Sequence, residues 1–390
     1  MTASSFLSAR RRRRIALPVL GSAALAAALV ALPGAATADP GYTVVASGLD
    51  NPRHLSIGPG NALFVAEAGV GGDGPCIVGA EGPACFGTSG AITRVDVHKG
   101  TQTRVLTGLP SLGSAPSDDP AAPPPGSNAA GPQDVVTQGS KTLVLTIGLG
   151  NNPAIRTEHP ELAQMGTLRI GTVGSSTTTL VADLAAHEAA NNPVPPTDAP
   201  DSNPDGFTQV GSGYVVADAG GNDLIEVAKD GTMTTHATFQ AQMATAPPFL
   251  GLPEGTQIPA QAVPTSAVAG PDGALYVSQL TGFPFQKGLA NIYKVDSSGA
   301  VSVYASGLTN VTDLDFGPGG VLYAVQIASD GLLGGPVGSV VSIPKGGGDA
   351  SVVAAGLFAP YGIAITGQTA YVTTGSVAPG GGQVIALPLR

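Results

Sequence analysis

Eight residues whose side chains could bind a ligand recur at wide intervals, each beside a proline or an equivalent turn position. They are Arg53, His54, Gln133, Asp134, Asp205, Thr265, Asp313 and Tyr361. Brought to one place, these cations, carboxylates, amides and hydroxyls would form a polar pocket of mixed charge. The alternative interpretation is that they only cap the ends of strands and bind water.

Three of these residues, Asp134, Asp205 and Asp313, are candidate metal ligands, with Asn51 or Asn203 as neutral ligands. Oxygen ligands of this kind suit calcium. The sequence does not require a cofactor, and calcium is the candidate if one is bound. A bound cation would also be needed for a hydrolase that activates water against a lactone or an ester.

Catalysis without a metal requires a nucleophile and a base that lie close together. His54 is the histidine expected near the other seven residues, and Glu67 is its candidate acid partner. A lone histidine often only caps a strand, and Glu67 could equally cap the loop that follows it. The sequence contains no Gly-x-Ser-x-Gly, His-Glu-x-x-His or phosphate-loop motif. We therefore expect a non-catalytic binding or scaffold protein, with a calcium-dependent lactonase or esterase as the alternative.

The elements that must position these residues repeat six times. Each segment begins with a turn, enters a short strand, turns again on glycine and continues into a second strand. The first strands begin near residues 52, 132, 204, 264, 311 and 360. Third and fourth strands follow, so the pattern predicts an all-β fold of four-stranded units. An open solenoid is the alternative, but it predicts a nearly constant repeat length, which these positions lack.

The sixth segment has no fourth strand before the sequence ends at Arg390. A matching strand is found at the other end, because residues 44–49 read Val-Val-Ala-Ser-Gly-Leu. Residues 303–308 and 352–357 are similar, and both are predicted fourth strands that lead into the next segment. The sequence therefore predicts a six-bladed β-propeller whose last blade is closed by the N-terminal strand.

The repeat resembles those of the NHL/TolB-like six-bladed propellers. Residues 205–207 together with 216–224 are the most similar to an NHL repeat. The whole chain after residue 38, including residues 48–54 and the two cysteines, resembles the ScyD/ScyE family, which is named after a gene cluster for the pigment scytonemin. The resemblance implies the propeller fold and no particular mechanism. Gluconolactonase and paraoxonase propellers carry acids and amides around an axial calcium, and the similarity to them is one of residue type.

The first 38 residues are predicted to be a secretory signal peptide. Five arginines at 10–14 precede an apolar stretch at 15–32, and Ala-Thr-Ala at 36–38 is a cleavage site. A membrane anchor is the alternative, but Pro18 and Gly21 interrupt the apolar stretch. We expect a secreted, extracellular protein, exported by the Sec or the twin-arginine route, with one propeller domain at 39–390.

The charge of the remaining chain restricts its partners. Removing residues 1–38 removes five arginines and no acid, which leaves 12 Lys+Arg, 27 Asp+Glu and a formal charge of −15. Such a surface repels nucleic acid and anionic lipid, and no later stretch is apolar enough to span a membrane. We expect a monomer that binds a small molecule, a glycan or a protein, and the absence of tryptophan weakens the glycan hypothesis.

Long connecting segments are predicted to open on one face of the ring. They are residues 68–89, 111–130, 148–166, 189–202 and 240–262. Loops on a rigid scaffold commonly carry binding sites, so this face is the expected binding face.

Cys76 and Cys85, nine residues apart, are predicted to form a disulfide in an exported chain. A metal pair would need further Cys or His ligands nearby. A redox role would favour Cys-x-x-Cys spacing.

Overall fold

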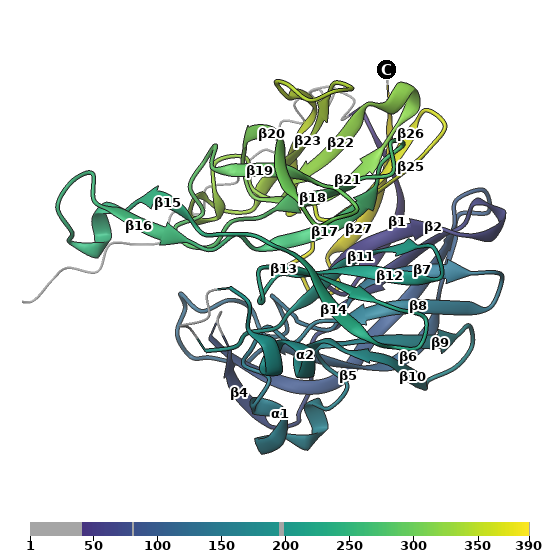
Figure 1. Ribbon diagram of the computed structural model, residues 1–390. Coiled ribbons are helices and arrows are strands. Elements are labelled where there is room, and N and C mark those ends of the chain that lie inside the picture. Colours follow the sequence, from purple (N-terminus) through teal and green to yellow (C-terminus); the bar gives the residue numbers. More distant parts are fainter. Residues whose placement is uncertain (1–40, 80–81, 195–198, 390) are drawn as a thin grey trace, which may run out of the picture. The chain divides into compact units, whose positions relative to one another are not determined.

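The predicted segments form antiparallel sheets that follow one another along the chain (Figure 1). The computed structural model describes residues 41–79, 82–194 and 199–389. Within these residues, the innermost strands of successive sheets contact one another in a closed cycle, so the sheets are the six blades of a propeller. The predicted signal peptide at 1–38 lies outside the described residues.

The strands of each blade are given in chain order, from the channel outward. Blade 1 contains β2 (Pro52–Ile57), β3 (Leu63–Glu67), β5 (Gly82–Asp96) and β6 (Thr101–Ser114). Blade 2 contains β7 (Pro132–Gln138), β8 (Thr142–Ile147), β9 (Thr167–Thr172) and β10 (Thr178–Asp183). Blade 3 contains β11 (Pro204–Val210), β12 (Gly213–Asp218), β13 (Asp223–Val227) and β14 (Met233–Thr238).

The second half of the chain repeats this order. Blade 4 contains β17 (Pro264–Ala269), β18 (Leu275–Gln279), β19 (Ala290–Val295) and β20 (Val301–Leu308). Blade 5 contains β21 (Val311–Phe316), β22 (Leu322–Gln326), β23 (Val337–Ile343) and β24 (Ser351–Phe358). Blade 6 contains β25 (Ile363–Thr366), β26 (Thr369–Thr374) and β27 (Gly382–Pro388), and β1 (Thr43–Leu49) is its outer strand.

Several predicted loops contain regular structure that the repeat did not indicate. In blade 1 the short strand β4 (Cys76–Gly79) pairs with an extended β5, and the disulfide between Cys76 and Cys85 joins these two strands. The helices α1 (Ile155–Glu158) and α2 (Leu184–Asn191) follow β8 and β10. The hairpin of β15 (Gln242–Thr245) and β16 (Gln257–Ala260) projects between blades 3 and 4 (Figure 1). Short 3-10 turns occur at η1 (Pro59–Asn61), η2 (Pro160–Leu162), η3 (Pro248–Leu250), η4 (Pro318–Gly320) and η5 (Leu332–Gly334).

Glycine sets the hairpin between the first two strands of a blade. Gly60 and Gly319 have φ angles of 71° and 73°, a left-handed conformation that is strained for residues with a Cβ. In the same turns, Gly58 donates to the carbonyl of Ala62, and Gly317 donates to that of Val321. The Gly-Pro-Gly sequence therefore produces the same turn in blades 1 and 5.

Apolar side chains of the second strands alternate between the two neighbouring blades, as the two-residue period of a strand requires. In β3, Phe64 packs toward blade 2 with Leu143, whereas Leu63 packs toward blade 6 with Tyr371. Equivalent clusters fill the other blade interfaces in the described chain. The core is thus a set of layers between blades, and each layer depends on both of its neighbours. No helix in the described residues is long and apolar enough to cross a membrane.

The N-terminal strand closes the ring as predicted. β1 pairs antiparallel with β27, and Val44 lies opposite Ile385 (Figure 1). Ala46 and Leu49 of this strand are buried in the apolar layer between blades 6 and 1. Full burial of one leucine is worth about 1.5–3 kcal/mol, so β1 contributes packing as well as backbone pairing.

Deleting residues 41–49 is predicted to destabilise the propeller, because it exposes the edge of β27 and opens the layer between blades 6 and 1. The matched control is deletion of residues 116–124, an equally long and mostly exposed stretch of the β6–β7 connection. We expect the first deletion to lower the thermal unfolding midpoint much further than the second. Equal midpoints for the two variants would contradict a stabilising role for β1.

Candidate functional site

The chain enters several inner strands through a residue in the left-handed conformation. Asn51, Val263, Asn310 and Ala359 have φ angles of 49°, 55°, 44° and 40°. Asparagine adopts this conformation readily, and the side-chain amide of Asn51 donates to the carbonyls of Gly69 and Gly126 at 2.6 and 2.8 Å. A β-branched residue such as Val263 is strained there. These bends place the first residues of each inner strand at one end of the channel.

His54 lies at the centre of the channel between two carboxylates. Its Nε2 is 3.1 Å from Oδ1 of Asp205, and its Nδ1 is 3.0 Å from Oδ2 of Asp313. His54, Asp205 and Asp313 are 2%, 1% and 5% exposed. They belong to blades 1, 3 and 5, so one imidazole ring joins three alternate blades.

The charges around His54 determine its protonation state. Burial alone would lower the pKa of His54, but the neighbouring carboxylates of Asp313 and Asp205 outweigh it and hold that pKa well above its ordinary value. The ring is therefore a cation near neutral pH, with one nitrogen directed at each carboxylate. Burial raises the pKa of Asp134 to about 6, although the charge of His54 opposes this rise.

The carboxylates also connect neighbouring blades. Asp134 accepts the backbone N–H of Phe207 in the next blade at 3.0 Å. Asp313 accepts the N–H of Ile363 at 2.8 Å and the hydroxyl of Ser266 at 2.7 Å. Much of the predicted ring of polar residues therefore holds blades together, as the strand-capping alternative proposed.

Threonine hydroxyls make a second set of bonds between neighbouring blades. Thr265 donates to the carbonyl of Val311 at 2.9 Å, and Thr312 donates to that of Tyr361 at 2.6 Å. The predicted site residue Thr265 thus has a structural partner in the next blade.

Tyr361 and Arg53 continue the network on one side of His54. The Tyr361 hydroxyl donates to Oδ2 of Asp205 at 2.6 Å, and burial together with this carboxylate holds the pKa of Tyr361 well above its ordinary value. The guanidinium carbon of Arg53 lies 4.8 Å from the centre of the Tyr361 ring, a cation–π distance. One terminal nitrogen of Arg53 donates to the carbonyl of Ala129 at 2.7 Å.

The network around His54 separates two cavities of the channel. The mouth cavity, at the beginning of the inner strands, has a volume of about 530 Å³ and includes Arg53, Gln133, Asp205, Thr265 and Tyr361 in its lining. The base cavity, farther along the same strands, has a volume of about 270 Å³ and includes His54, Asp134 and Asp313. The eight predicted residues do come together, but they are divided between the two sides of this partition.

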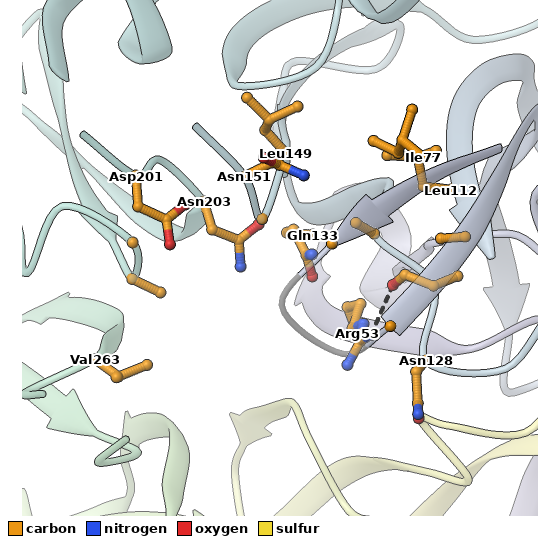
Figure 2. Close-up of a pocket in the computed structure, with 18 residues that line it drawn as sticks. Arg53, Ile77, Leu112, Asn128, Gln133, Leu149, Asn151, Asp201, Asn203 and Val263 are labelled. Atoms are coloured by element: carbon orange, nitrogen blue, oxygen red, sulfur yellow. Dashed lines mark hydrogen bonds between the residues drawn. The ribbon is translucent and has the colours of Figure 1, made fainter. Parts of the chain in front are cut away.

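A side pocket of about 270 Å³ adjoins the mouth cavity and shares Arg53, Gln133 and Asn203 with it (Figure 2). We call these three residues the polar wall. Gly148 allows its two amides to approach closely, because a Cβ there would lie 2.5 Å from Oδ1 of Asn203 and 2.8 Å from Nε2 of Gln133. The apolar residues Ile77, Leu112 and Leu149 lie together in another part of the pocket (Figure 2).

The polar wall contains buried atoms without partners. Nε of Arg53, Oε1 of Gln133 and Oδ1 of Asn203 have no hydrogen-bond partner among the described residues. Buried polar atoms are nearly always paired with protein, water or a ligand. These three atoms therefore lack the hydrogen bonds that a bound water or a polar ligand group would supply.

The mouth cavity also has an apolar side that the sequence analysis did not identify. Its lining there comes from blades 4, 5 and 6 and comprises Leu280, Phe285, Ile327, Leu332, Pro336 and Val377. These residues follow second strands, where loops diverge in sequence and length, so the repeat gave no signal for them.

Glu67 does not pair with His54. Its carboxylate accepts the hydroxyl of Thr93 and two N–H groups of Arg104, at 3.0 and 2.6 Å, and the backbone N–H of Asp50 at 2.8 Å. It therefore joins the second, third and fourth strands of blade 1 and holds the start of β2. The structure does not bring the two weak catalytic candidates together.

The candidate calcium ligands have other partners in this arrangement. The His54 cation supplies the positive charge beside Asp205 and Asp313 that a metal ion would otherwise provide. No group of three or more His, Cys, Asp or Glu side chains among the described residues is placed to hold a metal ion.

Replacing His54 with Gln is predicted to change how stability depends on pH. A histidine whose pKa is raised by folding stabilises the folded state. The full contribution is present at pH values below the pKa of the unfolded chain, and it is lost as pH rises through the higher pKa of the folded state. Folding raises the pKa of Asp134 to about 6 and that of Asp315 to about 7. As pH rises, ionisation of these two carboxyl groups therefore destabilises the folded state, mainly up to about pH 7. The unfolding midpoint of the parent protein should therefore fall further as pH rises above about 7, because His54 then approaches its raised folded-state pKa.

At pH 7 the His54→Gln variant should unfold at a lower temperature than the parent, because breaking a buried ion pair costs about 3–5 kcal/mol of stability. Above pH 7 its unfolding midpoint should depend less on pH than that of the parent. His98→Gln, at an exposed position, is the control and should keep the parent's pH profile. A His54→Gln variant with the parent's full slope above pH 7 would show that His54 is not the titrating group.

Comparisons with known proteins support the fold. No protein-family model matches the chain, and no curated protein matches it. A crystal structure of a protein of unknown function from Bacteroides thetaiotaomicron has a TM-score of 0.51 and 10% identity, covering 89% of this chain and 72% of that chain. Virginiamycin B lyase from Staphylococcus aureus has a TM-score of 0.45 and 12% identity, covering 90% and 99%. At these identities the similarity concerns the fold alone, and the resemblance to the ScyD/ScyE family stays a prediction.

Proposed function

We propose that the protein binds a small amphipathic organic molecule in the mouth cavity and side pocket and does not transform it. The polar wall would receive the polar end of the molecule. The apolar lining from blades 4 to 6 would cover its apolar part. Pockets of this kind, apolar with a few placed polar groups, are typical of small-molecule sites.

The observation that carries this proposal is the set of unpartnered atoms in the polar wall. Elsewhere in the described channel, Asp134, Asp205 and Asp313 have hydrogen-bond partners on other blades. Arg53, Gln133 and Asn203 each keep a buried polar atom without a partner. Their unpaired atoms include the donor Nε of Arg53 and the amide acceptors, so a ligand with both an acceptor and a donor fits them.

The protonation of the channel favours binding over general-base catalysis. A base must hold a free lone pair, but both nitrogens of the His54 cation face carboxylates. Glu67 is engaged by Arg104 and lies outside the lining of the mouth cavity. We keep a lactone or ester hydrolase as the outcome that would overturn the proposal.

We further propose that the protein is a secreted member of the ScyD/ScyE family. The predicted signal peptide and the resemblance along the chain support this proposal. The disulfide between Cys76 and Cys85 also suits an oxidising compartment.

The proposal predicts that small amphipathic molecules raise the thermal unfolding midpoint through the polar wall. The panel consists of medium-chain alkyl and aryl carboxylates, the matching primary amides, and lactones. A compound that stabilises the parent should bind about fivefold more weakly to Gln133→Leu or Asn203→Leu, because one hydrogen bond contributes about 1 kcal/mol. Affinities would be measured by isothermal titration calorimetry.

Gln368→Leu is the matched control, because it makes the same change in an exposed turn of blade 6 and should leave binding unchanged. The same panel would be followed for product formation by mass spectrometry. Equal binding by all variants would place the ligand elsewhere, and turnover of a lactone would replace the binding proposal with the hydrolase.

A further inference from the structure

Three acidic side chains gather beside the turn between the second and third strands of blade 3. Asp218 ends β12 and lies opposite Asp223, which begins β13. Glu188 comes from α2, the helix inserted after β10 (Figure 1). All three residues are fully buried, and we call them the acidic cluster.

Asp218 has structural partners that account for both of its oxygens. Oδ1 accepts the backbone N–H groups of Asn203, Gly220 and Gly221, at 2.6, 3.0 and 3.1 Å. Oδ2 accepts the hydroxyl of Ser202 at 2.7 Å. Asp218 therefore shapes the β12–β13 turn and the start of β11.

Glu188 and Asp223 have no such partners. None of their four carboxylate oxygens has a hydrogen-bond partner among the described residues. Both groups approach one face of Gly221, where a Cβ would lie 2.7 Å from Oε2 of Glu188 and 3.2 Å from Oδ1 of Asp223. The Thr235 hydroxyl is near Asp223 and 3.1 Å from Nε2 of His187, so it offers Asp223 a neutral hydrogen bond at most. Two buried carboxylates thus face each other without a counter-charge from the described residues.

Blade 1 shows how the same fold normally balances such a charge. Glu67 ends β3 as Asp218 ends β12, and Arg104 on the fourth strand neutralises it. In blade 1, Arg104 on the fourth strand pairs with Thr93 on the third strand, immediately after a register shift. Blade 3 has a register shift at the same place, and there Thr235 pairs with Ile225. Thr235 is therefore the counterpart of Arg104. Blade 3 therefore has two additional buried carboxylates and a neutral residue in place of the arginine.

No Lys or Arg in the described part of the chain forms an ion pair with the acidic cluster. Buried carboxylates without a counter-charge are strongly unfavourable. A positive group from outside the chain is the remaining way to keep both of them ionised.

We propose that Glu188 and Asp223 bind a divalent cation, calcium by its preference for hard oxygen ligands. Two carboxylates balance two positive charges. Because no group of three or more His, Cys, Asp or Glu side chains in the described residues is placed to hold a metal ion, water and backbone carbonyls would complete the coordination. A cavity of about 280 Å³ lies beside the same β12–β13 loop, with Asp201, Gly220 and Asn222 in its lining.

The site would fasten α2 to blade 3. Glu188 is the residue through which the helix reaches the β12–β13 turn, and α2 follows directly on the outer strand of blade 2. Calcium would thus stabilise the region where blades 2 and 3 meet, at a place separate from His54 and its carboxylates.

The test compares unfolding midpoints of the intact protein in EDTA and in increasing CaCl₂. Calcium that binds only the folded state should raise the midpoint progressively once its concentration exceeds the dissociation constant. Glu188→Gln removes one of the two repelling charges, so it should melt above the parent in EDTA and show no calcium shift. Glu226→Gln, at an exposed position on β13, is the matched control and should respond to calcium like the parent.

A second variant supplies the missing charge within the chain. Thr235→Arg places an arginine where Arg104 stands in blade 1, so it should raise the midpoint in EDTA and abolish the calcium shift. Asp134→Asn, in the channel, should keep that shift.

A parent protein indifferent to calcium would overturn the proposal and indicate that protons neutralise the pair. A calcium shift that survives Glu188→Gln but is lost in Asp134→Asn would place the ion in the channel instead.

Discussion

One imidazolium ring holds the centre of this propeller. His54 contacts Asp205 and Asp313 through its two nitrogens, so blades 1, 3 and 5 share a single charge. Burying three ionisable groups is unfavourable unless each is paired with good geometry. The pairing restricts how far these blades can rotate or move apart, and the mouth and base cavities exist on either side of it. The position of the polar wall therefore depends on this interaction, although His54 itself faces only the base cavity.

Several buried polar groups of the interior bond between blades, whereas two places concentrate buried polar atoms without partners. Thr265 and Thr312 donate across blade boundaries, and Asp134 and Asp313 accept there. The polar wall and the Glu188–Asp223 pair keep atoms without partners. Native proteins rarely leave buried polar atoms unpaired without a reason, and both places bring several such atoms together.

The repeat architecture was accessible from sequence because its signals are local. Turns such as Gly58-Pro59-Gly60 and alternating apolar residues define each hairpin within a few positions, and residues 44–49 repeat a recognisable fourth strand. The disulfide followed from two cysteines in one short insertion. These features need no knowledge of how blades are rotated about the axis.

The side-chain contacts within the site could not be predicted from the sequence in the same way. That His54 and Tyr361 both meet Asp205 depends on side chains from blades 1, 6 and 3, which are far apart in sequence. Glu188 was missed because it lies on a helix outside the repeat. The sequence indicates Asn203 only as a neutral metal ligand, since nothing in the residues around it in the chain shows that its side-chain oxygen stays unpaired.

The closure of the last blade also has a consequence for how the chain folds. β1 is among the first parts of the propeller to be synthesised, but its partner β27 is among the last. Until then β1 has a free edge, and blades 1 to 5 can form only as an open series of hairpins with local contacts. The contact that joins the two ends spans nearly the whole chain, and such contacts form slowly because a very long loop must close first. Folding is therefore expected to finish in one late step, in which β1, synthesised early, pairs with β27, synthesised last.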